Sequence, residues 1–342
     1  MRNFLKILSI DEYSITPKYL QLVNDFVAGI ENGLVQPGDL LPSINDLSFG
    51  LDTSRSTIER FYNELKKSGI IGTIPGKGAY VLDQKLAHQL KILLLFNKLS
   101  THKKIIYDAF AETLKGKAAI DFYVYNNDFH LFKKILTEKM DKGYNKIVVV
   151  PYFFDNEDKA AQLLDSIPKD KLIIMDKLME NVTGDYAAIY EDFEADIYKA
   201  LVNLLNALKK YQTIKIIFPE STYYSKGIIQ GFRNFCLDYF FEYEILPDIS
   251  KEIIQPKTVY INIVEDDLVL LIQRIKKTGY DIGTDVGIIS YNETAIKQVI
   301  LNGITTISTS FETLGAKTAE VVLNNDHEHY AVPFTVNLRA SL

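Results

Sequence analysis

Short apolar runs alternate with amphipathic segments from residue 90 onward, and this alternation limits the possible folds more than any other feature of the sequence. Runs that are apolar at every position are typical of strands buried on both faces of a parallel sheet. Strands that alternate with helices predict a doubly wound α/β architecture with right-handed crossovers. The predicted strands are 92–96, 121–125, 146–150, 171–175, 214–218, 242–246, 258–263 and 285–290; the predicted helices are 102–116, 128–142, 155–166, 193–209, 223–239 and 266–278.

These eight strands predict two open sheets rather than one, and ligands of such sheets bind beyond the carboxyl ends of the strands. A chain of 342 residues is also long enough for two or three domains. We expect an N-terminal domain at 1–82, a linker at 83–90, and a two-lobed domain at 91–342.

The first 85 residues have a different pattern, because their apolar residues recur at helical spacing. Thr16 and Pro17 predict an N-cap and the first position of a helix that ends at Gly33. Ser43 predicts the cap of a short second helix, and a third helix is expected from Arg55 to Lys67. Residues 70–82 predict a β-hairpin with its turn at Pro75-Gly76-Lys77-Gly78. Three helices and a hairpin favour a winged helix-turn-helix, but on pattern alone they are equally compatible with a plain structural subdomain.

Composition excludes several classes of function. With 38 Lys plus Arg against 44 Asp plus Glu, the chain is not a broadly basic protein that coats nucleic acid, although one local patch remains possible. A single cysteine, Cys236, excludes a disulfide framework within the chain and fits a reducing compartment, and five histidines make a structural zinc site improbable. No apolar run approaches about 18 residues, and the N-terminus lacks signal-peptide features. We therefore expect a cytoplasmic protein without a membrane segment, metal or cofactor.

Residues 37–81 carry a series of short motifs: Pro-Gly-Asp, Leu-Pro-Ser, Ser-Arg-x-Thr, a leucine before a glycine, and Gly-Lys-Gly. In this combination the segment resembles the DNA-binding domain of the GntR family of bacterial transcription regulators. The resemblance implies a winged helix-turn-helix.

The rest of the chain resembles the effector domain of the LacI/GalR repressors, whose fold is that of periplasmic sugar-binding proteins. The segments that carry this resemblance are DVGIISYNET at 285–294, ITTISTSFETLGAKTAEVVL at 304–323 and VPFTVNLRASL at 332–342. A GntR-type head on a LacI-type body is the arrangement of regulators of the arabinose-repressor type, without implying arabinose as the ligand. It implies a homodimer that binds a palindromic operator and responds to a small carbohydrate or sugar derivative.

The resemblance implies which residues touch DNA. Arg55, at the start of the second helix of the motif, is expected to reach a guanine edge, while the helix N-terminus faces phosphate. Lys77 is expected to touch the backbone or the minor groove from the wing. The full set of expected DNA-binding residues is Ser43, Asn45, Ser54, Arg55, Ser56, Thr57, Arg60, Gly76 and Lys77.

Two features of the head depart from the family. Many members have arginine in place of Asn45, and several have a basic residue in place of Glu59. Residues 1–83 also contain eight basic and ten acidic residues. The positive charge must therefore be focused by geometry, and we expect operator binding to depend steeply on dimerisation and salt.

Polar and aromatic residues just past the strand ends are the expected effector ligands, because sugars need carboxylates and amides for their hydroxyls and aromatic faces for their C–H surfaces. The candidates are Asn97, Lys98, Tyr125, Tyr152, Asp176, Glu191, Asp192, Glu220, Asp266 and Asn292. The resemblance singles out Asp176, Asp266 and Asn292. Ile228 replaces an arginine found in many sugar-binding members, although Lys226 or Arg233 could substitute for it.

The expected lobes are residues 90–189 with a helix near 311–323, and residues 190–308 with a terminal strand, so the chain would cross between them three times. Asp176 and Asp266 are expected to oppose each other across the gap. No glycine-rich phosphate loop follows the first strand, and no catalytic triad spacing is present, so we expect no enzyme. The alternative is a cytoplasmic small-molecule-binding module whose winged head mediates protein contacts instead of operator binding.

Overall fold

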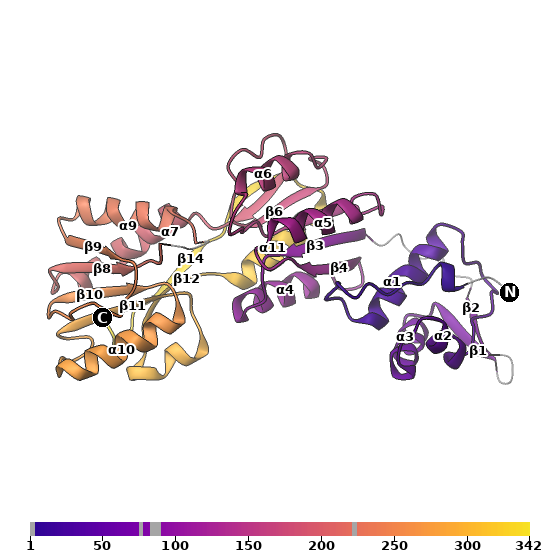
Figure 1. Cartoon of the computed structure of the whole chain (residues 1–342), viewed down its shortest axis with the longest axis horizontal. Coiled ribbons are helices and arrows are strands. Elements are labelled where there is room, and N and C mark those ends of the chain that lie inside the picture. The colour runs from indigo at the N-terminus through magenta and orange to yellow at the C-terminus, as the bar shows by residue number, and fades with distance from the viewer. Residues whose placement is uncertain (1–3, 75–77, 83–89, 221–223) are drawn as a thin grey trace.

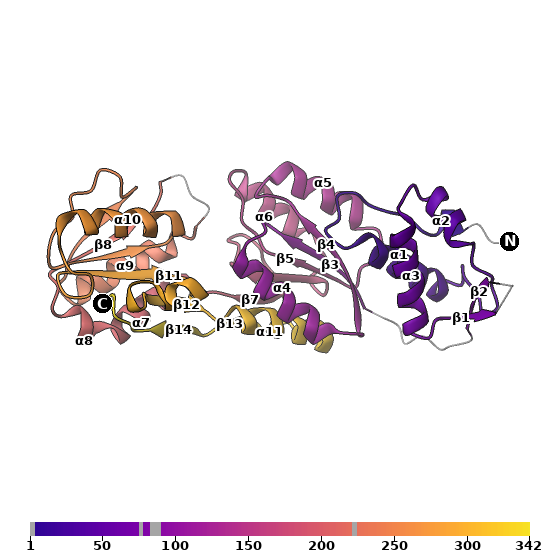
Figure 2. The ribbon, with the colours of Figure 1, turned by 90° about the horizontal axis from the view of Figure 1, so that it is seen from below.

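The computed structural model describes residues 4–74, 78–82, 90–220 and 224–342. Its three parts follow one another along the long axis of the molecule: an N-terminal head, a first lobe and a second lobe (Figures 1 and 2). The expected linker at 83–90 lies outside the described residues except for Leu90, the first residue of strand β3.

The head is a helix-turn-helix followed by a two-stranded hairpin. Apolar residues from all three α-helices and both strands form its core, including Phe26, Phe61 and Val81. Positive φ angles end two helices, at Gly33 and at Gly69. Its elements are η1 (Phe4–Lys6), α1 (Lys18–Glu31), α2 (Ile44–Gly50), α3 (Arg55–Lys67), β1 (Ile71–Ile74) and β2 (Gly78–Val81).

One capping prediction is wrong. The first helix begins at Lys18, with Pro17 at the N-cap position and no side-chain cap. The Thr16 hydroxyl instead bonds to the backbone of the first lobe, at Ile120 and Phe122. A cap needs a free side-chain oxygen, and a distant strand occupies this one.

The first lobe is a six-stranded parallel sheet in the order β13-β7-β6-β5-β3-β4, with α5 and α6 on one face and α4 and α11 on the other. Gly315 lets α11 approach α4 closely, since a Cβ there would lie 2.2 Å from the Ile106 carbonyl oxygen. Its elements are β3 (Leu90–Phe96), α4 (Thr101–Leu114), β4 (Ala118–Val124), α5 (Phe129–Lys139), β5 (Lys146–Val149), α6 (Glu157–Asp165), β6 (Leu172–Asp176), β7 (Ala187–Tyr190), α11 (Phe311–Asn324) and β13 (His329–Ala331).

The second lobe has the sheet order β14-β12-β11-β10-β8-β9, parallel except for β14. Helices α7, α8 and α9 cover one face, and α10 covers the other. Its elements are α7 (Phe193–Asn203), α8 (Leu205–Leu208), β8 (Thr213–Ile217), α9 (Gly227–Asp238), β9 (Glu242–Leu246), β10 (Thr258–Asn262), α10 (Glu265–Thr278), β11 (Val286–Tyr291), η2 (Ala295–Gln298), η3 (Ile300–Asn302), β12 (Thr305–Thr309) and β14 (Phe334–Asn337).

The doubly wound prediction is confirmed, and the chain crosses between the lobes three times: after β7, after β12 and after β13. Strands β7, β12 and β13 were absent from the predicted strand set, and the helix predicted at 193–209 is divided into α7 and α8. Because β7 and β12 each lead into the other lobe at their carboxyl ends, those ends of both sheets face each other. We call this the interlobe region.

Candidate DNA-binding surface and effector site

Helix α3 presents a capped N-terminus on the surface of the head. Ser54 accepts a hydrogen bond from the Thr57 amide at 3.2 Å, and its hydroxyl also bonds to those of Ser56 and Thr57, at 2.9 and 2.8 Å. Ser43 caps α2 in a reciprocal capping box with Asp46. The predicted Ser43 cap is confirmed, and Ser43 and Ser54 begin the two helices of the helix-turn-helix.

Arg55 lies at the exposed start of α3, with 65% of its side chain accessible. Its Nε donates to Glu59 Oε1 at 2.8 Å, and one terminal nitrogen donates to Asn45 Oδ1 at 3.4 Å. Asn45 and Glu59, the two positions that depart from the resembled pattern, therefore both bind Arg55. They fix the plane of its guanidinium group and neutralise part of its charge.

Three other expected DNA-binding residues, Arg60, Gly76 and Lys77, are not seen at the start of α3. Arg60 stacks on Tyr19 of α1, with its guanidinium carbon 4.6 Å from the ring centroid. This contact keeps Arg60 on the α1 side of the head. Gly76 and Lys77, at the expected wing tip, lie outside the described residues.

A buried charge cluster lies where β6 ends in the first lobe. The Lys103 ammonium group of α4 contacts the Asp176 carboxylate, and Tyr152 donates to the other Asp176 oxygen at 3.2 Å. Lys103 is 8% exposed and Asp176 is 2% exposed. Asp176 thus bonds to two partners from its own lobe. Asp176 was expected to oppose Asp266 across the gap; in the structure its carboxylate is paired with Lys103 inside the first lobe.

Two interlobe crossings are joined beside this cluster. Glu191, just past β7, accepts a hydrogen bond of 2.8 Å from the Thr309 hydroxyl at the end of β12. Burial raises the pKa of Glu191 to about 7, and burial also lowers the pKa of Lys103. His102 of α4 makes a further contact between the lobes, 3.3 Å from the Glu293 carbonyl oxygen.

The remaining first-lobe candidates differ in what they offer a ligand. Asn97 donates to Asn127 Oδ1 at 2.7 Å, while its own buried Oδ1 has no hydrogen-bond partner among the described residues. Tyr125 is wholly buried between Phe132 and Phe153, and its hydroxyl donates to the Val150 carbonyl. Tyr125 therefore shapes the core and presents no surface here. Lys98 is half-buried beside Asn97.

The second lobe contributes buried acceptors at the ends of β10 and β11. Within the described residues Asn262 Oδ1, Ser290 Oγ and Asn292 Oδ1 have no hydrogen-bond partner, and Asn262 and Ser290 are 0% exposed. Lys297 lies beneath this edge and donates to the carbonyls of Tyr291 and Asn292. Glu220 and Asp266 are exposed, the latter in the first turn of α10.

Sequence reasoning missed Lys103, Asn262, Ser290 and Thr309. Ser290 ends the predicted strand 285–290 and Asn262 interrupts the apolar run 258–263, and these polar positions were an available signal. Lys103 lies inside a helix, and its partner Asp176 is 73 residues away, so nothing local marks it.

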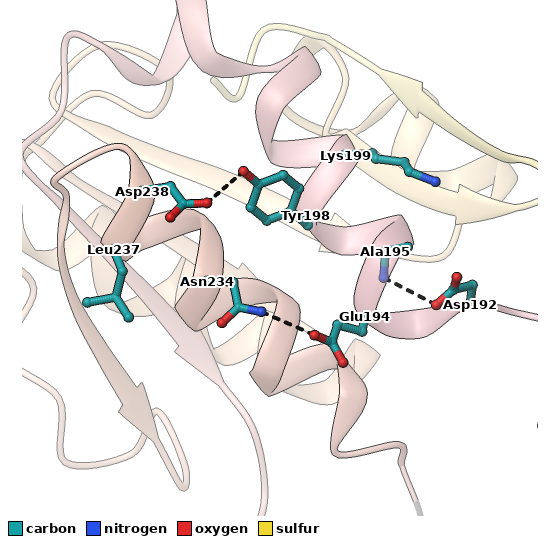
Figure 3. Close-up of a pocket in the computed structure, with 8 residues that line it drawn as sticks. All are labelled: Asp192, Glu194, Ala195, Tyr198, Lys199, Asn234, Leu237 and Asp238. Carbon is teal, nitrogen blue, oxygen red and sulfur yellow. Dashed lines mark hydrogen bonds between the residues drawn. The ribbon is translucent and has the colours of Figure 1, made fainter.

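A shallow groove also lies between α7 and α9 (Figure 3). Most polar groups on its walls bond to one another: Tyr198 to Asp238 at 2.8 Å and Asn234 to Glu194 at 3.1 Å. Asp192, an expected effector ligand, caps α7 here by accepting from the Ala195 amide at 3.3 Å. The groove is lined by helices α7 and α9, not by the carboxyl ends of the strands. The expected effector position is therefore the interlobe region.

Neither a metal cluster nor a membrane-spanning helix is found in the described part of the chain. Among the described residues no three His, Cys, Asp or Glu side chains gather as a metal site. Within the same part of the chain, no helix is long and apolar enough to cross a membrane.

Comparisons with known proteins divide the chain in the same way. Residues 18–81 match the family described as bacterial regulatory proteins, gntR family. Over 75 residues the chain is 35% identical to the HTH-type transcriptional repressor YtrA of Bacillus subtilis (strain 168), covering 22% of this chain and 58% of that repressor. It is 31% identical over 74 residues to the arabinose metabolism transcriptional repressor of Geobacillus stearothermophilus, covering 22% of this chain and 20% of that protein. The matched segment thus spans little more than half of YtrA.

Solved structures match the fold of the body. The Lac repressor bound to ONPG superposes with a TM-score of 0.63 at 15% identity, covering 98% of this chain and 100% of that one. A LacI family regulator from Enterococcus faecium with bound ribose gives a TM-score of 0.57 at 19% identity, covering 73% of this chain and 98% of that one. The chain therefore carries a GntR-type winged helix-turn-helix head on a body with the fold of LacI-type regulators.

Proposed function

We propose that this chain is a sequence-specific DNA-binding transcription regulator whose operator affinity changes when a small carbohydrate binds between its lobes. The observation that carries the proposal is the presence of two parts on one chain: a GntR-type head, and a body with buried, unpartnered acceptors at the carboxyl ends of strands in both sheets.

The head supports DNA binding through its geometry. The start of α3 exposes amide groups and Arg55 together, and helix N-termini bind phosphate while arginine reads guanine in the major groove. Ser54, Ser56 and Thr57 surround that helix start. We propose that Arg55 makes the base contact and that these hydroxyls face the backbone. Arg60, stacked on Tyr19, acts in the packing of the head instead.

The interlobe region supports a ligand rich in hydrogen-bond donors. A buried acceptor without a partner costs about 1–3 kcal/mol, and the hydroxyls of a sugar would remove that cost. The structural neighbours include complexes with ribose and with D-xylulofuranose, at 19% and 16% identity. We propose Asn97, Tyr152, Glu191, Asn262, Ser290 and Asn292 as the residues that contact the effector, with Lys103 and Asp176 forming the charged floor.

We further propose a cytoplasmic homodimer on a palindromic operator. The head carries more acidic than basic residues, so a single head offers a small positive patch, and a second copy adds a second half-site. The matched relatives are transcription regulators, and we propose that the body binds its ligand without transforming it.

A gel shift on the DNA upstream of the protein's own gene tests this function, with a panel of neutral pentoses and hexoses added in turn. We expect a specific shift that one or more sugars change by at least tenfold in protein concentration. The alternative, a head that mediates protein contacts, requires that no specific shift occurs while a sugar still binds by calorimetry.

A further inference from the structure

The segment before α1 lies against the first lobe, not only against the head. Strand β4 lies at one edge of the first sheet, and Ser14 pairs with Tyr123 there in an antiparallel bridge. The Ile15 amide donates to the Phe122 carbonyl at 2.7 Å. An edge strand offers free amides and carbonyls, and an added strand satisfies them by β-augmentation.

Thr16 extends this pairing with its side chain. Its hydroxyl accepts from the Phe122 amide at 2.9 Å and donates to the Ile120 carbonyl at 3.1 Å, and the residue is only 6% exposed. A hydroxyl can donate and accept at once, so a single side chain satisfies two backbone groups of β4.

Asp11 adds a charged contact to the same lobe. Its carboxylate accepts from Lys139 of α5 and from the Tyr123 hydroxyl, the latter at 2.9 Å. Side-chain exposure is 18% for Lys139 and 28% for Asp11. Lys134 of α5 lies 4.8 Å from the centre of the Tyr13 ring. The contacts therefore cover two elements of the lobe.

Gln21 of α1 ties the same segment to the head. Its Oε1 accepts from the Asp11 amide at 2.8 Å, and its Nε2 donates to the carbonyls of Thr16 and Asp11 at 2.7 and 3.2 Å. Asn24, one turn further along α1, donates to Asp121 of β4 at 3.4 Å. Figure 1 shows α1 beside β4, on the side of the head turned toward the first lobe.

We propose that residues 11–16 are a docking strand that holds the DNA-binding head on the first lobe, so that head and first lobe move as one body. These residues precede 18–81, the segment that matches the gntR family. The docking strand thus lies outside the matched segment. If the proposed regulatory function holds, a ligand that rotates one lobe against the other turns the head through this strand.

The docking itself is tested without DNA or sugar, by spin-label distance measurements on the full chain. Labels on Lys66→Cys in α3 and Lys133→Cys in α5 report the position of the head relative to the first lobe, since both residues are exposed. The native Cys236 is buried, and burial raises its pKa to about 12, so it does not take up the label.

We expect one narrow distance distribution in the labelled parent. Thr16→Val removes both hydroxyl bonds at nearly constant shape, and Asp11→Asn removes the ion pair; each broadens the distribution. Glu12→Gln is the matched control, because within the described residues Glu12 pairs with Lys18 on the head surface and not with the first lobe, and we expect it to leave the distribution unchanged. A broad distribution in the parent, or no effect of either substitution at Thr16 or Asp11, overturns the docking strand.

The link to regulation uses the same variants in the gel shift. Thr16→Val is expected to keep sugar affinity and sugar-free operator affinity within about threefold while the sugar-dependent change in operator affinity falls about tenfold. An unchanged response in a variant with a broadened distance distribution overturns the coupling. A parent chain that binds no operator refutes the proposed function, and the spin labels still decide the docking.

Discussion

Glu191 and Thr309 join the first two crossings between the lobes through a hydrogen bond of 2.8 Å, from the Thr309 hydroxyl to Glu191 Oε2. Both residues are buried where the chain leaves one sheet for the other. Any rotation of one lobe against the other must move this pair or pivot on it. A change of charge beside this pair is therefore expected to change the stability of the two-lobed body.

The charge of Glu191 acts on Asp196 in α7, and we predict that the stability of the protein depends on pH through Asp196. The residue is 6% exposed, and its Oδ2 has no partner among the described residues. Burial, followed by repulsion from Glu191 and Asp192, raises its pKa to about 7. The folded state thus holds this proton more tightly than the unfolded state. Its contribution to stability falls as pH rises from about 4 to 7, and stays lost above pH 7.

Asp196→Asn removes this loss because the amide does not ionise. One pKa unit corresponds to about 1.4 kcal/mol, and solvent screening of this site reduces the gain to about 1–2 kcal/mol at pH 8. Urea unfolding at pH 5 and pH 8 measures it, with the exposed Asp141→Asn as control. An equal gain at both pH values contradicts the assigned titration.

Glu59 should limit the affinity of the head for nonspecific DNA. Its carboxylate accepts from Arg55 Nε at 2.8 Å and cancels positive charge where phosphate approaches. We predict that Glu59→Gln raises nonspecific affinity about tenfold at low salt and steepens the salt dependence by about one unit. Arg55→Ala should cost about 1–3 kcal/mol of specific binding.

Fluorescence anisotropy on operator and random duplexes, over a series of salt concentrations, checks both variants. Glu242→Gln on β9 of the second lobe makes the same charge change away from the head and serves as control. If Glu59→Gln weakens binding to both duplexes, Glu59 acts mainly by orienting Arg55.

The fold was largely predictable because most strands are continuous apolar runs. Strand β12 was missed because four of its five residues are Thr or Ser, yet all five are buried. The three threonine hydroxyls are satisfied by partners distant in sequence: Thr305 by Arg339, Thr306 by Glu293 and Thr309 by Glu191. Hydrophobic periodicity cannot detect a buried strand whose side chains are mostly polar and hydrogen-bonded.

The site was predictable only in part, for a related reason. Strand-end positions follow from topology, so Asn97, Asp176 and Asn292 could be placed on the correct edge of each sheet. Whether such a side chain is free depends on contacts from other elements. The ion pair of Asp176 with Lys103 and the pairing of Thr16 with β4 are both of this kind.

Gly315 should be required for the packing of α11 on α4. A Cβ at this position would lie 2.2 Å from the Ile106 carbonyl oxygen and 3.0 Å from the Phe110 amide nitrogen. Backbone cannot move aside as a flexible side chain can. We predict that Gly315→Ala costs about 1–3 kcal/mol, more than alanine's gain in helix propensity. In α9, Gly227→Ala is the matched control, since its nearest neighbour is the Ser225 side chain at 3.2 Å. Equal unfolding midpoints in urea contradict the close approach.

Effector affinity should depend on the unpaired acceptors of the second lobe more than on its exposed carboxylates. Asn292 has a φ of +64°, so Asn292→Gly removes the amide without straining the backbone. The variant leaves one sugar hydroxyl without its acceptor, and we predict a loss of about 1–3 kcal/mol, or roughly tenfold to a hundredfold in affinity. Asp266 is exposed at the start of α10, so Asp266→Asn should change affinity by less than about threefold. Calorimetry with the sugar selected in the gel shift compares the two variants, and Asp141→Asn controls for the loss of one charge. A strong loss in Asp266→Asn with none in Asn292→Gly moves the site from the ends of β10 and β11 to the first turn of α10.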